Sequence, residues 1–496
     1  MNKDVKKIEI DDGLEYLKRC PFRVPEDAHT SKTAHSGIIS DFEIQLVEFM
    51  SKGYFRRNGG RLMMYDGLRY VEMTKVKLNT LIMNVLKFHG YSSVYRTKVV
   101  REIHDYVYAQ DYIPEFKPER RYVCFKNGVY DIDLEQMVKD ADQSIEAYIY
   151  IDHIFKENSR GYEFEKFINH VLPVKEDRMV LQEALGCMFI DRSQMKIENC
   201  FYLYGTGANG KSVISDLLKF MLGSELMSSY SMQELLVDND KLRSRAEIAG
   251  KLINFCSDMG TKDFSGGDYK KMVSGEEMNC RKINCDPFTT TLIPLFFASV
   301  NEFPNTSDYT HGSFRRNIVI PFSVTIHEKD QDKSLGAKLR GEVSYFISWI
   351  LKGYKRIKKQ ELLFTESKNV IEMINRMKTD SNPVLSFLDI KGYYKDDMKD
   401  GNEYEFNWLL CGNVHNDYVN WYIWEYGVGA NGVSKHVKKH KFRTMLMNEG
   451  FTCKEDSHTK QWDVKIYTKT GNKKSIDITE ENIFDSDQYV IDNLPF

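Results

Sequence analysis

The stretch Gly205-Thr206-Gly207-Ala208-Asn209-Gly210-Lys211-Ser212 decides the fold of the middle of this 496-residue chain. It lies between an apolar run, Cys200–Tyr204, and a run of helical character, Val213–Leu222. Backbone N–H groups of a glycine-rich turn wrap phosphates where a helix N-terminus follows, while the lysine neutralises charge and the serine hydroxyl holds magnesium. We therefore predict a phosphate-binding loop for ATP and Mg2+ over residues 205–212; a chance match is the alternative.

A second stretch, Gly427-Val428-Gly429-Ala430-Asn431-Gly432-Val433-Ser434, repeats the same glycine spacing. Val433 stands where the lysine is required, and the preceding Trp421–Tyr426 has no strand-like pattern. Without an ammonium group this stretch lacks the charge that neutralises a phosphate. It predicts a flexible surface loop and no nucleotide site.

Composition predicts a soluble globular protein. The chain is 42% hydrophobic with a formal net charge of −3, and its length predicts about three domains. No apolar run reaches about 18 residues and the charged N-terminus is unlike a secretory signal, so we expect a cytoplasmic protein without membrane contact. The nine cysteines form no Cys-x-x-Cys pair, which predicts neither disulfides nor zinc. The near-neutral charge leaves nucleic acid open, because local basic clustering matters more than the sum.

Changes in pattern divide the chain into five segments. A helical period in Ile39–Met50 and Val76–Phe88 predicts a mainly helical N-terminal domain, which ends at the proline-bracketed Ile113–Arg121. Alternating strands and helices from Glu198 to about Val324 predict a parallel α/β sheet. The predicted segments are 1–115, the helical domain; 116–195, a β-hairpin with a helical lead-in; 196–330, the P-loop core; 331–380, a helical connector; and 381–496, an aromatic-rich domain with an acidic tail.

The lead-in to the core has two predicted parts. Arg121–Asp133 alternates around Asn127-Gly128, a dipeptide that supplies the positive φ angles of a two-residue hairpin turn. Glu163–Ile190 then reads as helices that lead into the phosphate-binding loop.

Two polar residues end apolar strands of the core. Leu252–Asp258 has the form of a strand whose carboxylate reaches Mg2+ beside bound phosphates, although Asp258 alone could be a turn residue. Thr291–Asn301 is a long apolar strand that ends in an amide able to orient a water at the γ-phosphate. Taken alone, Asn301 would also be a turn residue.

Arg315 and Arg316 stand directly before the apolar strand Asn317–Phe322. A rigid strand can present a guanidinium to a phosphate, as an arginine finger does. The alternative is a solvated, salt-bridging strand edge.

The order of these motifs resembles the superfamily 3 helicases, and more closely the primase-helicase branch of poxviruses, phages and plasmids. The resemblance is strong over about 160–330 and extends more weakly to the upstream hairpin, which looks like a helicase-associated domain, and to the C-terminal module. Besides the phosphate-binding loop and the strand ending in Asp258, it rests on Lys270-Lys271-Met272-Val273-Ser274-Gly275, Arg281-Lys282, Ala298-Ser299-Val300-Asn301-Glu302-Phe303-Pro304, and Arg315-Arg316 with Pro321-Phe322. It implies a modified AAA+ core and six subunits in a ring around DNA.

The resemblance also implies a role for each matching residue. Lys211 contacts the phosphates, Ser212 and Asp258 hold Mg2+, with Asp258 as the Walker B acid, and Asn301 is the sensor. Arg316 is the arginine finger for the ATP of a neighbouring subunit, and Arg315 is its companion.

The Walker B strand departs from the family pattern. Relatives usually carry a glutamate or two adjacent acids there, whereas Asp258 is followed by Met259 and Gly260. A shorter aspartate still meets magnesium, but the group that polarises the attacking water stays open.

The family places a DNA-contacting hairpin between the Walker B strand and the sensor. Here that segment holds the basic residues Lys270, Lys271, Arg281 and Lys282, which can grip a single-stranded backbone without reading its sequence. The alternative is a solvated basic loop balanced by the acids Asp268, Glu276 and Glu277.

A second basic segment lies near the C-terminus. Ser434–Arg443 carries five Lys or Arg and no acid, and Thr444–Phe451 after it is a predicted helix. It resembles the winged-helix module that ends many relatives, with Lys435, Lys438 and Lys439 as candidate DNA contacts. A solvated basic helix face is the alternative.

Primase chemistry is not expected. Asp131 and Asp133 alternate as two metal-binding carboxylates on one strand face would, but no further acid and histidine set follows nearby.

These expectations describe an ATP-driven, ring-forming DNA helicase that replicates a phage, plasmid or other mobile element. It would act as a homo-hexamer on single-stranded and forked DNA, in a bacterial cell or the cytoplasm of a virus-infected host, beside a separate primase or polymerase. The rivals are an AAA+ ATPase that melts an origin or loads another helicase, and a nucleotide-gated DNA-binding initiator without translocation.

Overall fold

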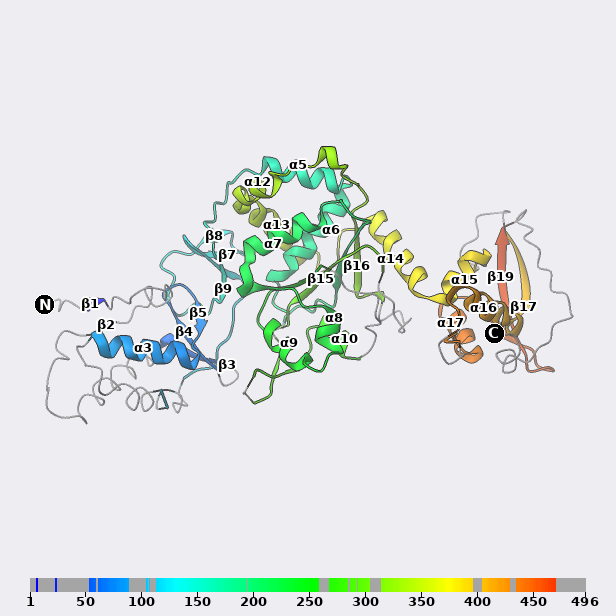
Figure 1. Ribbon diagram of the computed structural model, residues 1–496, viewed down its shortest axis with the longest axis horizontal. Helices are drawn as coiled ribbons and strands as arrows, with labels where there is room; N and C mark the ends of the chain where they lie inside the picture. Colours follow the sequence, from blue (N-terminus) through cyan, green and yellow to red (C-terminus); the bar gives the residue numbers. More distant parts are fainter. Residues whose placement is uncertain are drawn as a thin grey trace, which may run out of the picture. The chain divides into compact units, whose positions relative to one another are not determined.

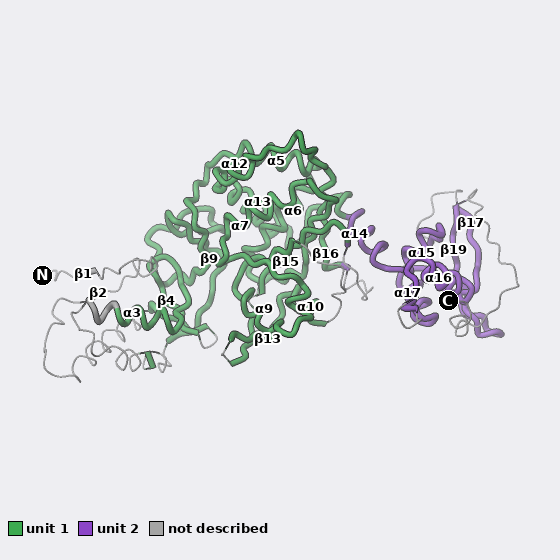
Figure 2. Tube along the Cα trace, viewed as in Figure 1, with its two compact units in different colours: residues 1–259, 266–302, 315–370 green, residues 260–265, 303–314, 371–496 purple. Residues whose placement is uncertain are grey.

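The computed structural model describes residues 53–58, 61–88, 113–192, 194–257, 267–283, 286–291, 293–303, 314–395, 404–428 and 434–469, with short pieces at 6–7, 23–24, 104–105 and 107. The chain forms two compact units (Figure 2). Unit 1 comprises residues 1–259, 266–302 and 315–370, and unit 2 comprises 260–265, 303–314 and 371–496. Within the described ranges, no helix is long and apolar enough to cross a membrane.

The core of unit 1 is a five-stranded parallel sheet in the order β11-β12-β15-β10-β16. Most of its residues are apolar and buried, as expected where helices cover both faces of a parallel sheet. Parallel strands bring their carboxyl ends to one edge, which is where such sheets bind ligands. The strands are β10 (Cys200–Tyr204), β11 (Met227–Ser228), β12 (Ile253–Cys256), β15 (Leu295–Val300) and β16 (Asn317–Pro321).

Helices flank this sheet. In the view of Figure 1, α5, α6, α7, α12 and α13 lie above β15, and α8, α9 and α10 lie below it. The alternation of strands and helices predicted for this segment, and the helices predicted over 163–190, are confirmed. The bounds are α5 (Tyr162–Val171), α6 (Lys175–Gly186), η3 (Cys187–Phe189), α7 (Lys211–Leu226), α8 (Met232–Leu236), α9 (Lys241–Ile248), α10 (Gly267–Val273), η4 (Glu328–Asp330), α12 (Leu335–Gly341) and α13 (Val343–Lys359).

Helices α6 and α13 pack closely against each other. A Cβ added to Gly353 of α13 would lie 1.9 Å from the carbonyl oxygen of Gln182 on α6, so only glycine permits this approach. Glu183 on the same helix is fully buried, and its carboxylate accepts hydrogen bonds from the Arg356 guanidinium and the Thr365 N–H. A buried charge needs such partners, so the pair fixes one register between the helices.

The N-terminal part of unit 1 contains a sheet that the sequence did not predict. Strands β3 (Phe55–Asn58), β4 (Arg61–Tyr65) and β5 (Tyr70–Glu72) pair antiparallel, and α3 (Lys75–Phe88) follows. The helix predicted at 76–88 is confirmed, whereas that at 39–50 lies outside the described residues. A short apolar run such as β4 does not distinguish strand from helix by its period, so the described part of 1–115 contains this sheet beside the predicted helix.

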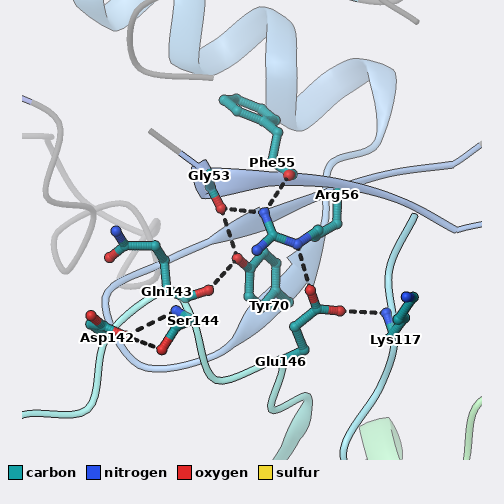
Figure 3. A network of polar contacts seen from close by, with 9 residues as sticks. All are labelled: Gly53, Phe55, Arg56, Tyr70, Lys117, Asp142, Gln143, Ser144 and Glu146. Atoms are coloured by element: carbon teal, nitrogen blue, oxygen red, sulfur yellow. Dashed lines mark hydrogen bonds and ion pairs between the residues drawn. The ribbon is translucent and has the colours of Figure 1, made fainter. Parts of the chain in front are cut away.

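A polar network joins this small sheet to the segment before β9 (Figure 3). The Arg56 guanidinium lies 2.6 Å from Glu146, whose other oxygen accepts the Lys117 N–H. The Tyr70 hydroxyl lies 2.9 Å from the Gly53 carbonyl oxygen and 2.7 Å from that of Gln143. Burial raises the pKa of Tyr70, so its hydroxyl stays protonated and can donate.

The predicted hairpin is present, but its turn is shifted by one residue. Phe125 pairs with Gly128, so Lys126 and Asn127 form the turn, and of these positions only Gly128 has a positive φ, +134°. The Asn127 amide instead binds both backbone groups of Phe155 at 2.9 Å, which holds the chain beyond β9. The strands form a sheet in the order β8-β7-β6-β9, with β6 (Tyr122–Phe125), β7 (Gly128–Asp131), β8 (Gln136–Met137) and β9 (Ile149–Ile151).

Unit 2 has its own core and a three-stranded antiparallel sheet in the order β17-β19-β18. Buried Phe387, Tyr418, Phe442, Leu446 and Ile466 from its helices and strands form one cluster. The helix predicted to begin at Thr444 begins five residues earlier, at Lys439. The elements are α14 (Lys368–Ser381), which begins in unit 1, α15 (Pro383–Lys391), β17 (Tyr404–Leu410), α16 (Cys411–Tyr426), α17 (Lys439–Asn448), β18 (Cys453–Glu455) and β19 (Trp462–Lys469).

Candidate nucleotide and nucleic-acid sites

The predicted phosphate-binding loop connects β10 to α7, at the carboxyl edge of the sheet. Gly207 and Gly210 have φ values of +114° and +88°, and Gly210 directly precedes the first turn of α7. No side chain caps this helix, so its first N–H groups face the loop. Thr206, Ala208 and Ser212 are exposed, which leaves them accessible to a ligand.

Lys211 is buried beneath the loop. Its Nζ donates to the Gly205 carbonyl oxygen at 2.5 Å, to Asn209 Oδ1 at 2.9 Å and to Asn301 Oδ1 at 3.3 Å. Burial lowers the pKa of this ammonium group, because the charge is partly desolvated. The three oxygens that accept from Lys211 are neutral, so a bound anion would neutralise its charge.

Asn301 and the loop are neighbours because their strands are. Tyr204 at the end of β10 pairs with Val300 at the end of β15, and the Gly205 N–H donates to the Val300 carbonyl at 3.1 Å. Asn301 therefore follows its strand directly beside the loop, with its side chain on Lys211. The pairing of Tyr204 with Pro321 brings the end of β16 to the same edge.

Asp258, predicted as the magnesium ligand, lies outside the described residues. The strand before it, β12, ends at Cys256 and pairs in parallel with β15, with Cys256 opposite Ala298. The chain thus leaves β12 at the same edge as the loop.

Asn209 shapes the loop rather than facing outward. It is 3% exposed, and its Nδ2 donates to the Phe322 carbonyl at 3.0 Å while its Oδ1 accepts from Lys211. A Cβ on Gly205 would lie 2.0 Å from Asn209 Nδ2 and 2.5 Å from the Phe322 oxygen. Asn209 belongs to the predicted nucleotide-binding loop, but this role of its side chain was not predicted.

Arg315 and Arg316 lie at the opposite edge of the sheet. They precede β16, whose first residue, Asn317, pairs with Cys200, the first residue of β10. Both contact Glu198, at 3.0 Å from Arg315 Nη2 and 3.6 Å from Arg316 Nη2. The Arg315 side chain is 54% exposed and that of Arg316 only 11%.

Arg316 also contacts the segment that leads to the basic hairpin. Its Nε donates to the Ser274 hydroxyl at 3.3 Å, directly after α10. Neither Glu198 nor Ser274 was singled out as a site residue. Glu198 could have been found as an acid directly before the strand of the phosphate-binding loop, whereas the contact from Ser274 spans 42 residues and leaves no local pattern.

The predicted DNA-contacting residues divide between a helix and a hairpin. Lys270 and Lys271 lie on α10, and Arg281 and Lys282 follow β13 (Met278–Cys280), which pairs antiparallel with β14 (Phe288–Thr290). Lys271 and Arg281 are exposed, while Lys282 lies 3.5 Å from Glu72.

Two of the acids that could balance this hairpin have other contacts. Asp268 lies 2.9 Å from Arg245, and Glu277 accepts the Thr289 hydroxyl at 2.6 Å. Asp268 is therefore paired outside the hairpin, whereas Glu277 keeps its negative charge beside Thr289 of β14.

In unit 2, Lys435, Lys438 and Lys439 are all exposed around the start of α17. The segment before that helix is held on α16, because the Val437 N–H and carbonyl bind Tyr418 at 3.2 Å and His415 at 2.8 Å. Lys435, Lys438 and Lys439 therefore lie on and beside a fixed segment.

The paired carboxylates considered for primase chemistry have protein contacts. Asp131 is 2% exposed and lies 3.1 Å from Arg121. Asp133 accepts from the Tyr354 hydroxyl at 2.6 Å and from Lys358 at 2.7 Å, contacts that lower its pKa. Both carboxylates thus tie the hairpin to neighbouring side chains.

Comparison with known proteins finds a family model and a viral relative that each match part of this chain. A family of unknown function (DUF5906) matches residues 203–316, the segment from the loop to the arginine pair. A protein of Acanthamoeba polyphaga mimivirus, whose name describes it provisionally as a helicase, is 23% identical over 304 residues. The match covers 55% of this chain and 31% of that protein, so the chain spans about a third of the relative's length.

Similar solved structures are those of the NrS-1 C-terminal region. One apo structure has a TM-score of 0.42 at 14% identity and covers 84% of this chain and 97% of that one. Its A form has a TM-score of 0.43 at 14% identity, with 86% and 98% covered.

Proposed function

We propose that this protein is an ATP-driven DNA helicase that assembles as a ring and acts in the replication of a virus, phage or other mobile element. The observation that carries the proposal is the buried Lys211, which reaches the loop carbonyl and Asn301 at the carboxyl edge of a parallel sheet. The similarity to the mimivirus protein supports the choice of a helicase among ATPases.

The strand order supports an AAA+ core. The strand that carries Asn301, β15, lies between the loop strand β10 and β12, the strand before Asp258. Lysine, amide and acid then approach one ligand from neighbouring strands, as hydrolysis of a Mg2+-bound triphosphate requires. In this proposal Ser212 and Asp258 hold Mg2+, the loop N–H groups and Lys211 bind phosphate, and Asn301 orients the water.

The position of the arginine pair supports assembly. The five residues of β10, about 16 Å of strand, separate the two edges of the sheet, so neither arginine reaches the loop of its own subunit. An arginine finger at this edge must act on the ATP of a neighbouring subunit, and a repeated head-to-tail contact closes into a ring. We propose six subunits, with Arg316 as the finger once it leaves Glu198, and Arg315 beside it.

DNA would be held by two basic regions. Lys270 and Lys271 of α10, with Arg281 and Lys282 of the β13–β14 hairpin, grip one strand through its phosphates and move with each turnover. From α15 onward, the order helix, strand, helix, helix, strand, strand in unit 2 supports a winged helix, in which Lys435, Lys438 and Lys439 would contact forked DNA. A separate primase or polymerase would use the single strand that is released.

Steady-state ATP hydrolysis with and without single-stranded DNA tests the proposal. We expect stimulation by DNA, loss in Lys211→Ala and in Arg316→Ala, and partial rescue when the two variants are mixed, because a mixed interface combines an intact loop with an intact arginine. Turnover indifferent to DNA would favour an origin-melting or helicase-loading ATPase. Absence of turnover under every condition would leave a nucleotide-gated initiator and sink the helicase proposal.

A further inference from the structure

We propose that the outer face of the β17-β19-β18 sheet in unit 2 is a stacking surface for single-stranded nucleic acid. This outer face is defined by Tyr404, Phe406 and Trp408 of β17 and Lys465 and Lys469 of β19, which surround the buried Tyr467. It is distinct from Lys435, Lys438 and Lys439, it needs no ATP, and it rests on the proposed function only for the choice of DNA over RNA.

The aromatic residues share one side of β17. Successive side chains of a strand point to opposite faces, so Tyr404, Phe406 and Trp408 point away from Leu409, which packs on the core of unit 2. Phe406 is 53% exposed and Trp408 is 43% exposed. Large aromatic rings are ordinarily buried, so two of them at alternate positions of one strand indicate a binding surface.

Lysines alternate with these rings across the strand pair. Register places Lys469 opposite Tyr404, Tyr467 opposite Phe406 and Lys465 opposite Trp408. Lys465 Nζ lies 4.6 Å from the centroid of the Phe406 ring and 5.0 Å from that of Tyr467. Lys469 Nζ lies 5.9 Å from the centroid of Tyr404.

The rings are also fixed in position. Phe406 contacts Tyr467 with centroids 5.7 Å apart, and Tyr404 meets Tyr394 edge to face at 5.4 Å. Tyr394 is joined to Tyr467 by two backbone hydrogen bonds of 2.8 Å, which fix the edge of the sheet there. Preorganised rings bind with a smaller loss of side-chain entropy than mobile ones.

This pairing of rings and ammonium groups fits single-stranded nucleic acid better than a protein. Bases that are not paired stack on exposed aromatic faces, and their phosphates are neutralised by lysines beside the rings. A purely apolar partner would bury Lys465 and Lys469 without a counter-charge, which is costly. Among the described residues of the three strands, the acid on this face is Asp463, which lies beyond the end of the row and pairs with Leu410 and Lys454.

Titration of the full chain with oligo(dT), without nucleotide, tests the inference. We expect tryptophan fluorescence to be quenched and Trp408→Phe to lose most of the quench while keeping its affinity within about twofold, because phenylalanine still stacks. Phe406→Ala with Trp408→Ala should weaken binding about tenfold or more, the loss expected for removed stacking contacts. The matched control is Trp424→Ala on α16, a tryptophan 81% exposed away from this sheet, which should change affinity less than twofold.

All arms use the Lys211→Ala background, so failure of the motor proposal leaves this measurement intact. The inference would be overturned if the Trp408→Phe variant and the protein that retains Trp408 showed equal quenching of tryptophan fluorescence. The inference would also be wrong if Phe406→Ala with Trp408→Ala changed the sedimentation of the protein but not its affinity for oligo(dT). A second copy of the chain would then be the partner that covers the face. Binding of oligo(rU) as tight as that of oligo(dT) supports a single-stranded surface, whereas binding of oligo(rU) alone overturns the choice of DNA. Trp408→Phe also serves as the folding control, because its volume change is small.

Discussion

Two glycine-rich stretches with the same Gly-x-Gly-Ala-Asn-Gly spacing have different surroundings. Gly205–Ser212 follows strand β10 and opens helix α7, whereas Gly427–Ser434 follows the end of helix α16. A strand delivers the first stretch to the edge of a sheet where a second strand brings Asn301. The second stretch has no such neighbour among its described residues, and residues 429–433 lie outside them.

The first glycine of each stretch shows the difference at atomic scale. A Cβ on Gly205 would lie 2.5 Å from the Phe322 oxygen, whereas nothing lies within 4 Å of a Cβ on Gly427. Gly427 instead ends α16 with φ +71° and ψ −168°, a backbone conformation that essentially only glycine adopts. One glycine permits close packing around a buried lysine, and the other permits a turn.

The largest effect should come from Lys211→Ala. Without the ammonium group, the charge of the triphosphate is not neutralised in the loop, and we expect ATP turnover to fall about 1000-fold or more. Lys219→Ala on the exposed face of the same helix is the matched control and should stay within twofold. Steady-state phosphate release measures both; equal losses in the two variants would indicate that the helix, and not the loop, is at fault.

Asn301→Ala should have the next largest effect. It removes the oxygen 3.3 Å from Lys211 Nζ and the amide proposed to orient the water, so we expect kcat to fall about 100-fold with a small change in KM. Asn407→Ala, an exposed asparagine of β17, is the control. A rise in KM at unchanged kcat would assign Asn301 to binding instead of hydrolysis.

Sequence patterns predicted the loop and its sheet well because their signals are local. Strand, glycine turn and helix are adjacent in the chain, and the apolar runs of the core are long enough to show that they are buried. The hairpin at 121–133 was also predicted, from its alternating strand pattern. The predicted turn, Asn127 and Gly128, lies one residue after the observed turn, Lys126 and Asn127. The Asn127 side chain is engaged by Phe155, 28 residues away, which no local rule contains.

Long-range contacts account for what the sequence missed. The burial of Arg316 depends on Glu198 and Ser274, which come from other parts of the chain. Arg315 and Arg316 are adjacent in the same sequence motif, yet their side chains differ about fivefold in exposure. Likewise, the sequence predicted only that the segment containing β17 is rich in aromatic residues. Which of these residues are exposed to solvent depends on which face of the sheet packs on the core of unit 2. Register, not composition, decides both cases.

Gly205→Ala and Gly427→Ala should have smaller effects, and only Gly205→Ala should change ATP affinity. Gly205→Ala forces Asn209 and Phe322 apart, which should cost about 1–3 kcal/mol and weaken ATP binding. Gly427→Ala meets no atom, but φ +71° with ψ −168° is a conformation that essentially only glycine adopts, so it should also cost about 1–3 kcal/mol, with ATP affinity unchanged. Thermal unfolding and titration with a fluorescent ATP analogue measure the two quantities; equal loss of ATP affinity would erase the distinction between the stretches.

The smallest effect should come from completing the second motif. Val433→Lys gives residues 427–434 the full glycine, lysine and serine pattern, yet we expect no second ATP site, because the stretch follows a helix instead of a strand. Equilibrium binding should give the same stoichiometry as the unchanged chain, and in the Lys211→Ala background Val433→Lys should restore neither binding nor turnover. A second bound ATP would mean that the lysine, and not the strand before it, separates the two stretches.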